Sequence, residues 1–153
     1  MARARFRTRQ GDWLADHAAR GRARGKRGED LAVEWLEQRG FDVLQRNLRR
    51  RQAGEVDLLA CKAGVLHIIE VKTGGGSLEQ LIERVDERKV RRLLQTLACS
   101  GWLEGGRGGG ACVVDLLLVQ LGEGGPRLQL VEDVCPPEIQ WRGGADLAGG
   151  PHV

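Results

Sequence analysis

The feature that most constrains the fold is the stretch 54–73, "GEVDLLACKAGVLHIIEVKT", in which a short turn separates two apolar runs. The second run, residues 65–73, is rich in β-branched residues and almost continuously hydrophobic, which is typical of a central strand with both faces of its sheet covered. Because the Lys-Ala-Gly turn is short, the two strands should be antiparallel neighbours. The sequence therefore predicts a covered sheet with this hairpin near its centre.

The rest of the chain supplies further strands and the helices that cover them. Apolar residues recur on one helical face in residues 27–40, and residues 41–49 alternate as a short strand does. A long helical pattern runs from Leu81 to Ala98. It leads to a strong strand at 112–121, which should pair in parallel with an earlier strand, and to a last edge strand at 127–134. This order predicts a single α/β domain with a mixed central sheet of about five strands flanked by helices.

The two ends of the chain differ in composition from its middle. Residues 1–25 alternate Arg with small residues and lack an apolar period, so we expect a flexible basic N-terminal arm. Residues 26–134 should form the folded domain. Residues 135–153 are rich in Pro and Gly, and we expect a disordered tail.

Charge and cysteine content narrow the choice of partner and compartment. Residues 1–51 hold 14 Lys and Arg against 7 Asp and Glu, although the whole chain has a net charge of only +3. This excess of positive charge in residues 1–51 would favour the binding of a polyanion such as nucleic acid. A general bias of the composition towards Arg and Gly would produce the same excess. The chain shows neither an apolar run of ~18 residues nor a secretory leader, so no membrane partner is expected. Four scattered cysteines without metal-site spacing favour reduced thiols in the cytoplasm.

Charged residues in the central hairpin define a candidate site. Residues two apart on a strand share a face at roughly 6.6 Å, so Glu70 and Lys72 lie side by side. If the hairpin register permits, Asp57 on the preceding strand converges with them. Two adjacent carboxylates repel unless one is protonated or a cation lies between them, and Mg²⁺ or Mn²⁺ suits such oxygen ligands. Lys72 could then orient a water molecule or stabilise charge on phosphorus. The alternative is a solvent-exposed structural salt bridge on an edge strand.

Other residues extend this site or compete with it. Glu29, near the N-terminal end of the first predicted helix, could add a further metal ligand. The run Arg49, Arg50 and Arg51 is well placed for phosphates, although surface solubilisation explains it equally well. His67 should point away from the site, and Asp115 should be a hydrogen-bonded structural acid.

The segments "RGEDLAVEWLEQRGFDVLQRNLR", "GEVDLLACKAGVLHIIEVKT", "RVDERKVRRLL" and "CVVDLLLV" closely resemble the YraN-like family. That family is assigned to the PD-(D/E)xK nuclease superfamily and is similar to archaeal Holliday-junction resolvases. The resemblance implies a restriction-endonuclease-like core in which Asp57, Glu70 and Lys72 match the motif and Glu29 matches the helix acid. Lys89 matches a family lysine, where phosphate binding competes with a solvated helix face. Gly74 departs from the pattern, because the family usually has Arg there.

Taken together, these features predict a Mg²⁺-dependent (or Mn²⁺-dependent) endonuclease acting on DNA, with branched or structured DNA as one candidate substrate. The predicted catalytic residues are Lys72, Asp57 and Glu70, and the predicted metal ligands are Asp57, Glu70 and Glu29. The predicted nucleic-acid contacts are Arg49, Arg50, Arg51 and Lys89. A non-catalytic nucleic-acid-binding module of the same fold and a protein-interaction scaffold remain alternatives. A homodimer is compatible with this class, because junction-cutting enzymes commonly need two active sites.

Overall fold

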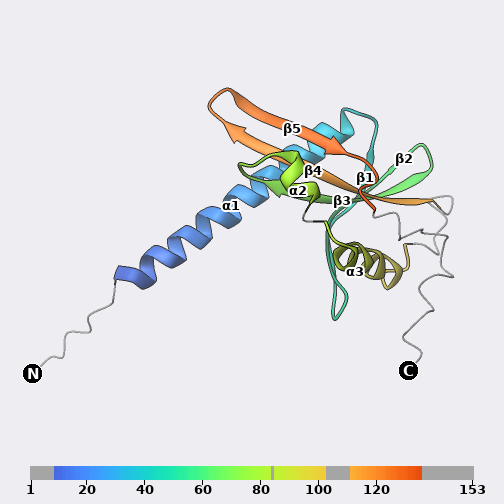
Figure 1. Ribbon diagram of the computed structural model, residues 1–153, viewed down its shortest axis with the longest axis horizontal. Coiled ribbons are helices and arrows are strands. Elements are labelled where there is room, and N and C mark those ends of the chain that lie inside the picture. Colours follow the sequence, from blue (N-terminus) through green and yellow to red (C-terminus); the bar gives the residue numbers. More distant parts are fainter. Residues whose placement is uncertain (1–8, 84, 103–110, 136–153) are drawn as a thin grey trace, which may run out of the picture.

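The computed structural model of the protein describes residues 9–83, 85–102 and 111–135. Its elements in chain order are α1 (Arg9–Glu37), β1 (Asp42–Arg50), β2 (Gly54–Lys62), β3 (Val65–Thr73), α2 (Leu78–Ile82), α3 (Glu87–Ala98), β4 (Cys112–Gly122) and β5 (Gly125–Val131). The strands form one sheet, with helices against it and the N-terminal end of α1 extending well away from it (Figure 1).

The sheet has five strands in the order β1-β2-β3-β4-β5. Strands β3 and β4 pair in parallel, while the other neighbouring pairs are antiparallel. The prediction of a mixed sheet with β3 at its centre and the last strand at an edge is confirmed. In the β2–β3 turn, Ala63 and Gly64 both have positive φ, as a tight hairpin turn of this kind requires.

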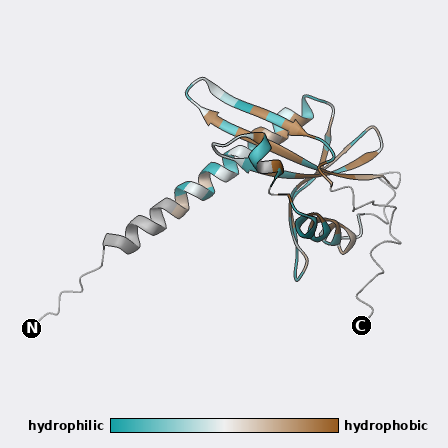
Figure 2. Ribbon diagram, viewed as in Figure 1, coloured by the Kyte–Doolittle hydropathy of each residue, from teal (hydrophilic) through white to brown (hydrophobic). Residues whose placement is uncertain are grey.

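The continuous hydrophobicity of β3 follows from its position between two apolar layers. Ile69 and Val71 pack on one face of the sheet with Ala32 and Leu36 of α1. Ile68 packs on the other face, in the cluster that α3 covers with residues such as Val90, Leu93 and Leu97. Each such fully buried side chain contributes roughly 1.5–3 kcal/mol. Figure 2 shows the apolar residues gathered on the central strands, between α1 and α3.

The expected flexible arm covers residues 1–25, of which residues 1–8 lie outside the described residues and residues 9–25 belong to α1. This segment has no apolar stripe to signal a helix that packs on a core. It does, however, contain several Ala and Arg, which favour helix, and no Pro. Ala and Arg thus favour the extension of α1 beyond the part that contacts the sheet, while Gly11, Gly21 and Gly25 oppose it. Residues 136–153 lie outside the described residues, so a C-terminal tail stays a prediction, as does a domain boundary at residue 26.

The helical pattern expected over 81–98 belongs to two helices, α2 and α3, rather than to one. Asp86 interrupts the pattern with an extended backbone, φ −93° and ψ 163°, and its side chain accepts a hydrogen bond from the Lys89 N–H at 2.8 Å. Such an N-cap satisfies one of the unpaired amides of the first turn and starts a new helix. The break fixes where the face of α3 that carries Lys89 begins. The last strand also ends earlier than predicted, at Val131.

The buried polar pair His67 and Asp115 has a structural role, as predicted. His67 Nδ1 lies 2.6 Å from Asp115 Oδ2, and the Asp133 N–H donates to Asp115 Oδ1 at 2.9 Å. Asp115 therefore holds the segment after β5 against β4. Among the described residues, no helix combines the length and apolar character that crossing a membrane requires.

Candidate active site

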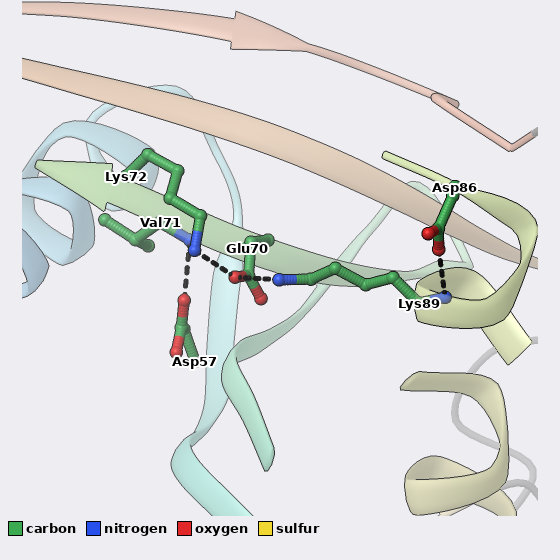
Figure 3. Close-up of polar contacts among 6 residues, drawn as sticks. All are labelled: Asp57, Glu70, Val71, Lys72, Asp86 and Lys89. Atoms are coloured by element: carbon green, nitrogen blue, oxygen red, sulfur yellow. Dashed lines mark hydrogen bonds and ion pairs between the residues drawn. The ribbon is translucent and has the colours of Figure 1, made fainter. Parts of the chain in front are cut away.

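Asp57 and Glu70 meet where strands β2 and β3 separate. The last pair in the ladder between these strands is Leu58 with Ile69, so Asp57 and Glu70 occupy the next position on each strand. Beyond that pair, the Asp57 side chain replaces the backbone as the hydrogen-bond acceptor. Its Oδ2 accepts a hydrogen bond from the Val71 N–H at 2.8 Å. Figure 3 shows Asp57, Glu70 and Lys72 together at this point. The predicted convergence of these three residues is therefore what the hairpin register produces.

Glu70 is the centre of the cluster and receives two ammonium groups. Its Oε1 lies 2.5 Å from Lys72 Nζ and 2.5 Å from Lys89 Nζ, which reaches in from α3. Glu70 is only 8% exposed. A solvent-exposed salt bridge on an edge strand is therefore excluded. Burying a carboxylate costs free energy unless cations or hydrogen bonds compensate it, and here two lysines do so.

Burial and neighbouring charges determine which groups of the cluster are protonated. Burial and then the negative charge of Glu70 raise the pKa of Asp57 to about 6, against the hydrogen bond from the Val71 N–H. Burial also raises the pKa of Glu70, but hydrogen bonds from Lys72 and Lys89 outweigh it, and the net shift is downward. Burial lowers the pKa of Lys72, yet its bond to Glu70 more than offsets this effect and raises it. Near neutral pH, Glu70 is thus an anion, Lys72 a cation, and Asp57 the group that titrates.

We expect the stability of the protein to fall as pH rises through the Asp57 titration. The folded chain binds the Asp57 proton with a pKa of about 6 against an ordinary 3.8, so it holds that proton more tightly than the unfolded chain does. Asp57 therefore contributes at most about 3 kcal/mol to the free energy of unfolding below about pH 4, and this contribution is lost between about pH 4 and 6. Urea unfolding at a series of pH values measures the effect.

The variant Asp57→Asn isolates this titration because it keeps the shape of the side chain and removes its charge. Its stability relative to the wild type should rise between pH 4 and 7 and then level off. A difference between the two proteins that is independent of pH would contradict the raised pKa. Above pH 6, Mg²⁺ should stabilise the wild type but not the variant, because a ligand stabilises only the folded state that binds it.

A pocket of about 400 Å³ opens beside the two carboxylates. Its wall combines one end of the β2–β3 pair with the first turns of α3: Gly54, Glu55, Asp57, Glu70, Asp86, Arg88, Lys89, Arg92 and Leu93. Arg92 lies over Gly54, where a Cβ atom would come within 3.7 Å of its Nη2. The pocket therefore joins buried carboxylates to a set of cations.

Sequence reasoning missed two of these cations, Arg88 and Arg92. They flank Lys89 on α3, and Arg92 follows Arg88 by one helical turn, so the two share a face of the helix. The spacing was readable from "DERKVRRLL" only once Asp86 was recognised as the start of a helix.

Arg49, Arg50 and Arg51 lie at the tip of the β1–β2 hairpin, beside the pocket rather than in its wall. Arg49 Nη2 lies 2.9 Å from Glu55 Oε1, and Glu55 is part of the pocket wall. Arg50 Nη1 donates to the carbonyl oxygen of Arg49. These arginines are thus placed for phosphates outside the pocket, and a contact with nucleic acid stays a prediction.

The carboxylate of Glu29 is held by a hydrogen bond from β1. Its Oε2 accepts a hydrogen bond from Asn47 Nδ2 at 3.1 Å, although its negative charge still helps to raise the pKa of Asp57. Within the described residues, no three His, Cys, Asp or Glu side chains are grouped closely enough to hold a metal ion. Of the three predicted metal ligands, Asp57 and Glu70 lie together in the structure, and Glu29 does not complete a group of three with them. Two carboxylates suit Mg²⁺, which keeps several waters and takes further oxygens from a phosphate.

Comparison with known proteins finds a family match that covers the segment building this site. The model of a family described as "Uncharacterised protein family UPF0102" matches residues 28–119. A UPF0102 protein of Persephonella marina is 43% identical over 77 residues, which are 48% of this chain and 63% of the relative. For a UPF0102 protein of Thermotoga petrophila the identity is 41% over 71 residues, 46% of this chain and 64% of the relative. One from Campylobacter lari is 38% identical over 73 residues, 48% of this chain and 63% of the relative. The chain thus spans about 63–64% of the length of these relatives.

Proposed function

The chain belongs to the uncharacterised protein family UPF0102, and we propose from its own site that it is a metal-dependent endonuclease that hydrolyses phosphodiester bonds of DNA. Its resemblance to junction resolvases extends the proposal to branched DNA. The observation that carries it is the meeting of Asp57, Glu70 and Lys72 beside a pocket lined by Arg88, Lys89 and Arg92. A buried acid pair, a lysine and phosphate-binding cations are what metal-assisted phosphodiester hydrolysis needs.

Asp57 and Glu70 are the residues that would hold Mg²⁺ or Mn²⁺. A bound ion of this kind polarises a phosphoryl oxygen and acidifies water. Two observations support the fit. Burial and then the negative charge of Glu70 raise the pKa of Asp57, and a cation beside both carboxylates would relieve their repulsion. Both groups also offer only oxygen atoms, which these ions prefer.

Lys72 supplies a positive charge at the reacting phosphate. Its pKa is raised, so it is protonated near neutral pH and acts as a donor rather than a base. Held 2.5 Å from Glu70, its ammonium group can donate to a phosphoryl oxygen or orient a water molecule. The cations of α3 would hold the neighbouring phosphates.

Lys89 is expected to exchange its partner Glu70 for a DNA phosphate. The variant Lys89→Gln should then weaken DNA binding and lower the slope of log K against log salt concentration by about 0.9. Arg91→Gln is the matched control, because Arg91 lies on the same helix but pairs with Glu87 on an exposed face. Fluorescence anisotropy with labelled DNA over a salt series measures both. Equal slopes for the two variants would contradict a phosphate contact by Lys89.

One observation favours a second function, a nucleic-acid-binding module without hydrolysis. Lys72 and Lys89 already neutralise Glu70 through the same oxygen, Oε1, so the carboxylate needs no ion to be stable. If these lysines stay on Glu70 when DNA binds, the site recognises phosphates and does not cut. This module would retain the salt-dependent binding and lack any dependence on metal.

The deciding experiment incubates purified protein with four-way junction, flapped and linear DNA in Mg²⁺, in Mn²⁺ and in EDTA. Cleavage that needs a divalent ion supports the endonuclease, and comparison of the three DNAs identifies the preferred form. Salt-sensitive binding without cleavage in any buffer supports the module. Absence of both binding and cleavage overturns the two proposals and leaves the protein-interaction scaffold.

Two further proposals concern the cellular compartment and the oligomeric state of the protein. All four cysteines, Cys61, Cys99, Cys112 and Cys135, lie in the described part of the chain and are free of disulfide bonds. This supports a reducing compartment such as the cytoplasm. A homodimer would present two sites to a branched substrate, and sedimentation with and without junction DNA measures the assembly.

A further inference from the structure

The ten residues of α1 that directly precede its contact with the sheet are strongly basic. We call residues 18–27 the basic stem. The stem carries no acidic residue, and all of its cations are exposed: Arg20, Arg22, Arg24, Lys26 and Arg27. Most of its remaining residues are Ala and Gly. The candidate active site, whose cations lie on β3 and α3, does not account for this concentration of charge.

Packing shows where the stem leaves the body of the protein. Gly28 is buried against Thr73, and Ala32 and Leu36 continue the contact with the sheet. A Cβ atom added at Gly21 or Gly25 would meet nothing within 4 Å. Figure 1 shows α1 extending away from the sheet towards its N-terminal end.

Repulsion makes such a helix costly to maintain alone. Arg22 and Lys26 are four residues apart, and like charges at this spacing destabilise a helix by about 0.2–0.5 kcal/mol per pair. Helical stability in proteins usually comes from packing an apolar face, which the stem lacks. An anionic partner along the stem would remove the repulsion and favour the helix.

The stem begins at the edge of the candidate active site. Gly28 packs on Thr73, which follows Lys72 on β3 but faces α1, whereas Glu70 and Lys72 lie on the side of the sheet that α3 covers. The next residue of α1, Glu29, is close enough to the site to affect the pKa of Asp57. The base of the stem therefore lies near Asp57, at the end of the β2–β3 pair, and a polyanion bound there can continue along the stem.

The chemistry of the stem selects nucleic acid over a lipid surface. Membrane-surface helices pair a basic face with large apolar side chains that enter the bilayer, and residues 18–27 have no large apolar side chain. Ten helical residues span about 15 Å, a length over which duplex DNA presents many phosphates at one charge per ~1.7 Å. We propose that the basic stem is a second DNA-binding surface, which holds the duplex leaving the candidate active site through phosphate contacts that need no metal.

This inference rests on the proposed function for the placement of DNA at the site, but its test does not depend on hydrolysis. Binding of a 30-base-pair duplex is measured by fluorescence anisotropy in EDTA over a salt series. The stem variant is Arg22→Gln/Arg24→Gln. The matched control, Arg39→Gln/Arg127→Gln, removes the same charge outside the stem and the pocket. At ~0.9 per lost phosphate contact, the stem variant should lower the slope of log K against log salt concentration by about 1.8, while the control stays near the wild type.

The outcomes separate this inference from the proposed function. A stem variant whose slope equals that of the control overturns the inference, even if the wild type cleaves DNA. A reduced slope supports it, even if cleavage is never observed. Binding of the full protein to vesicles containing phosphatidylserine, stronger than its binding to duplex DNA at equal salt and weakened in the stem variant, would also overturn it.

Discussion

Replacing Lys72 with Ala is expected to lower the rate of metal-dependent DNA cleavage by about 10²–10⁴-fold, the range for loss of one positioned donor or proton-transfer group. The ammonium group of Lys72 is held 2.5 Å from Glu70 and protonated, so the variant removes a fixed positive charge from the place where the transition state gains negative charge. DNA binding should change little, because the cations of α3 and the stem remain. Single-turnover cleavage at saturating protein separates the chemical step from binding.

Lys62→Ala is the matched control for this prediction. Lys62 lies at the far end of β2 from the site, with its ammonium group over the ring of Phe41. Its variant should cleave at the wild-type rate. If Lys72→Ala also cleaves at that rate, either a contaminating nuclease is responsible or the site lies elsewhere, and the proposed assignment fails. Glu70→Gln gives an independent check, because it removes the proposed ligand while retaining a side chain of the same size.

The central part of the fold could be predicted because its signals are local and repetitive. In β3, the apolar residues on both sides of the strand require two covering layers, and the short turn after Lys62 makes β2 its antiparallel neighbour. The same register places Asp57 opposite Glu70. Pattern and turn length together thus suffice to bring the acids and Lys72 into one place.

The contribution of the helices could not be predicted in the same way. The position of Lys89 at Glu70 depends on where α3 starts and how it crosses the sheet, which tertiary packing decides. Glu29 lies on the expected helix, yet Asn47 on β1 holds its carboxylate. The helix before Gly28 was missed because it lacks an apolar period, the signal on which sequence reasoning depends.

The site also shows why stability and function compete here. Without an ion, Asp57 is buried beside an anion and its pKa is raised, so the folded chain is less stable at neutral pH than it would be with Asn at this position. Glu70 is offset by two lysines, one of which can leave it for a phosphate. This cost in stability is useful only where a cation or a phosphate binds beside the charged groups and relieves it. The proposed function supplies both ligands.

Replacing Gly28 with Ala should destabilise the protein by about 3 kcal/mol, in the upper range for overpacking a tight contact. A Cβ atom at Gly28 would lie 1.8 Å from Thr73 Oγ1, 2.8 Å from Thr73 Cβ and 2.9 Å from Thr73 Cγ2. Because the Cβ of Thr73 is itself too close, rotation of that side chain cannot relieve the clash, and α1 must move off the sheet. Urea unfolding monitored by tryptophan fluorescence measures the loss.

The same substitution one turn earlier should have the opposite sign. At Gly25 an added Cβ meets nothing within 4 Å, so Gly25→Ala should stabilise the helix by up to about 1 kcal/mol through helix propensity alone. Combining Gly28→Ala with Thr73→Gly removes all three clashing atoms, and the double variant should be more stable than the sum of the single changes predicts. If Gly28→Ala and Gly25→Ala shift stability equally, α1 does not pack on β3 as described. The basic stem would then lose the close contact that fixes its base on β3, although Ala32 and Leu36 would still pack α1 on the sheet.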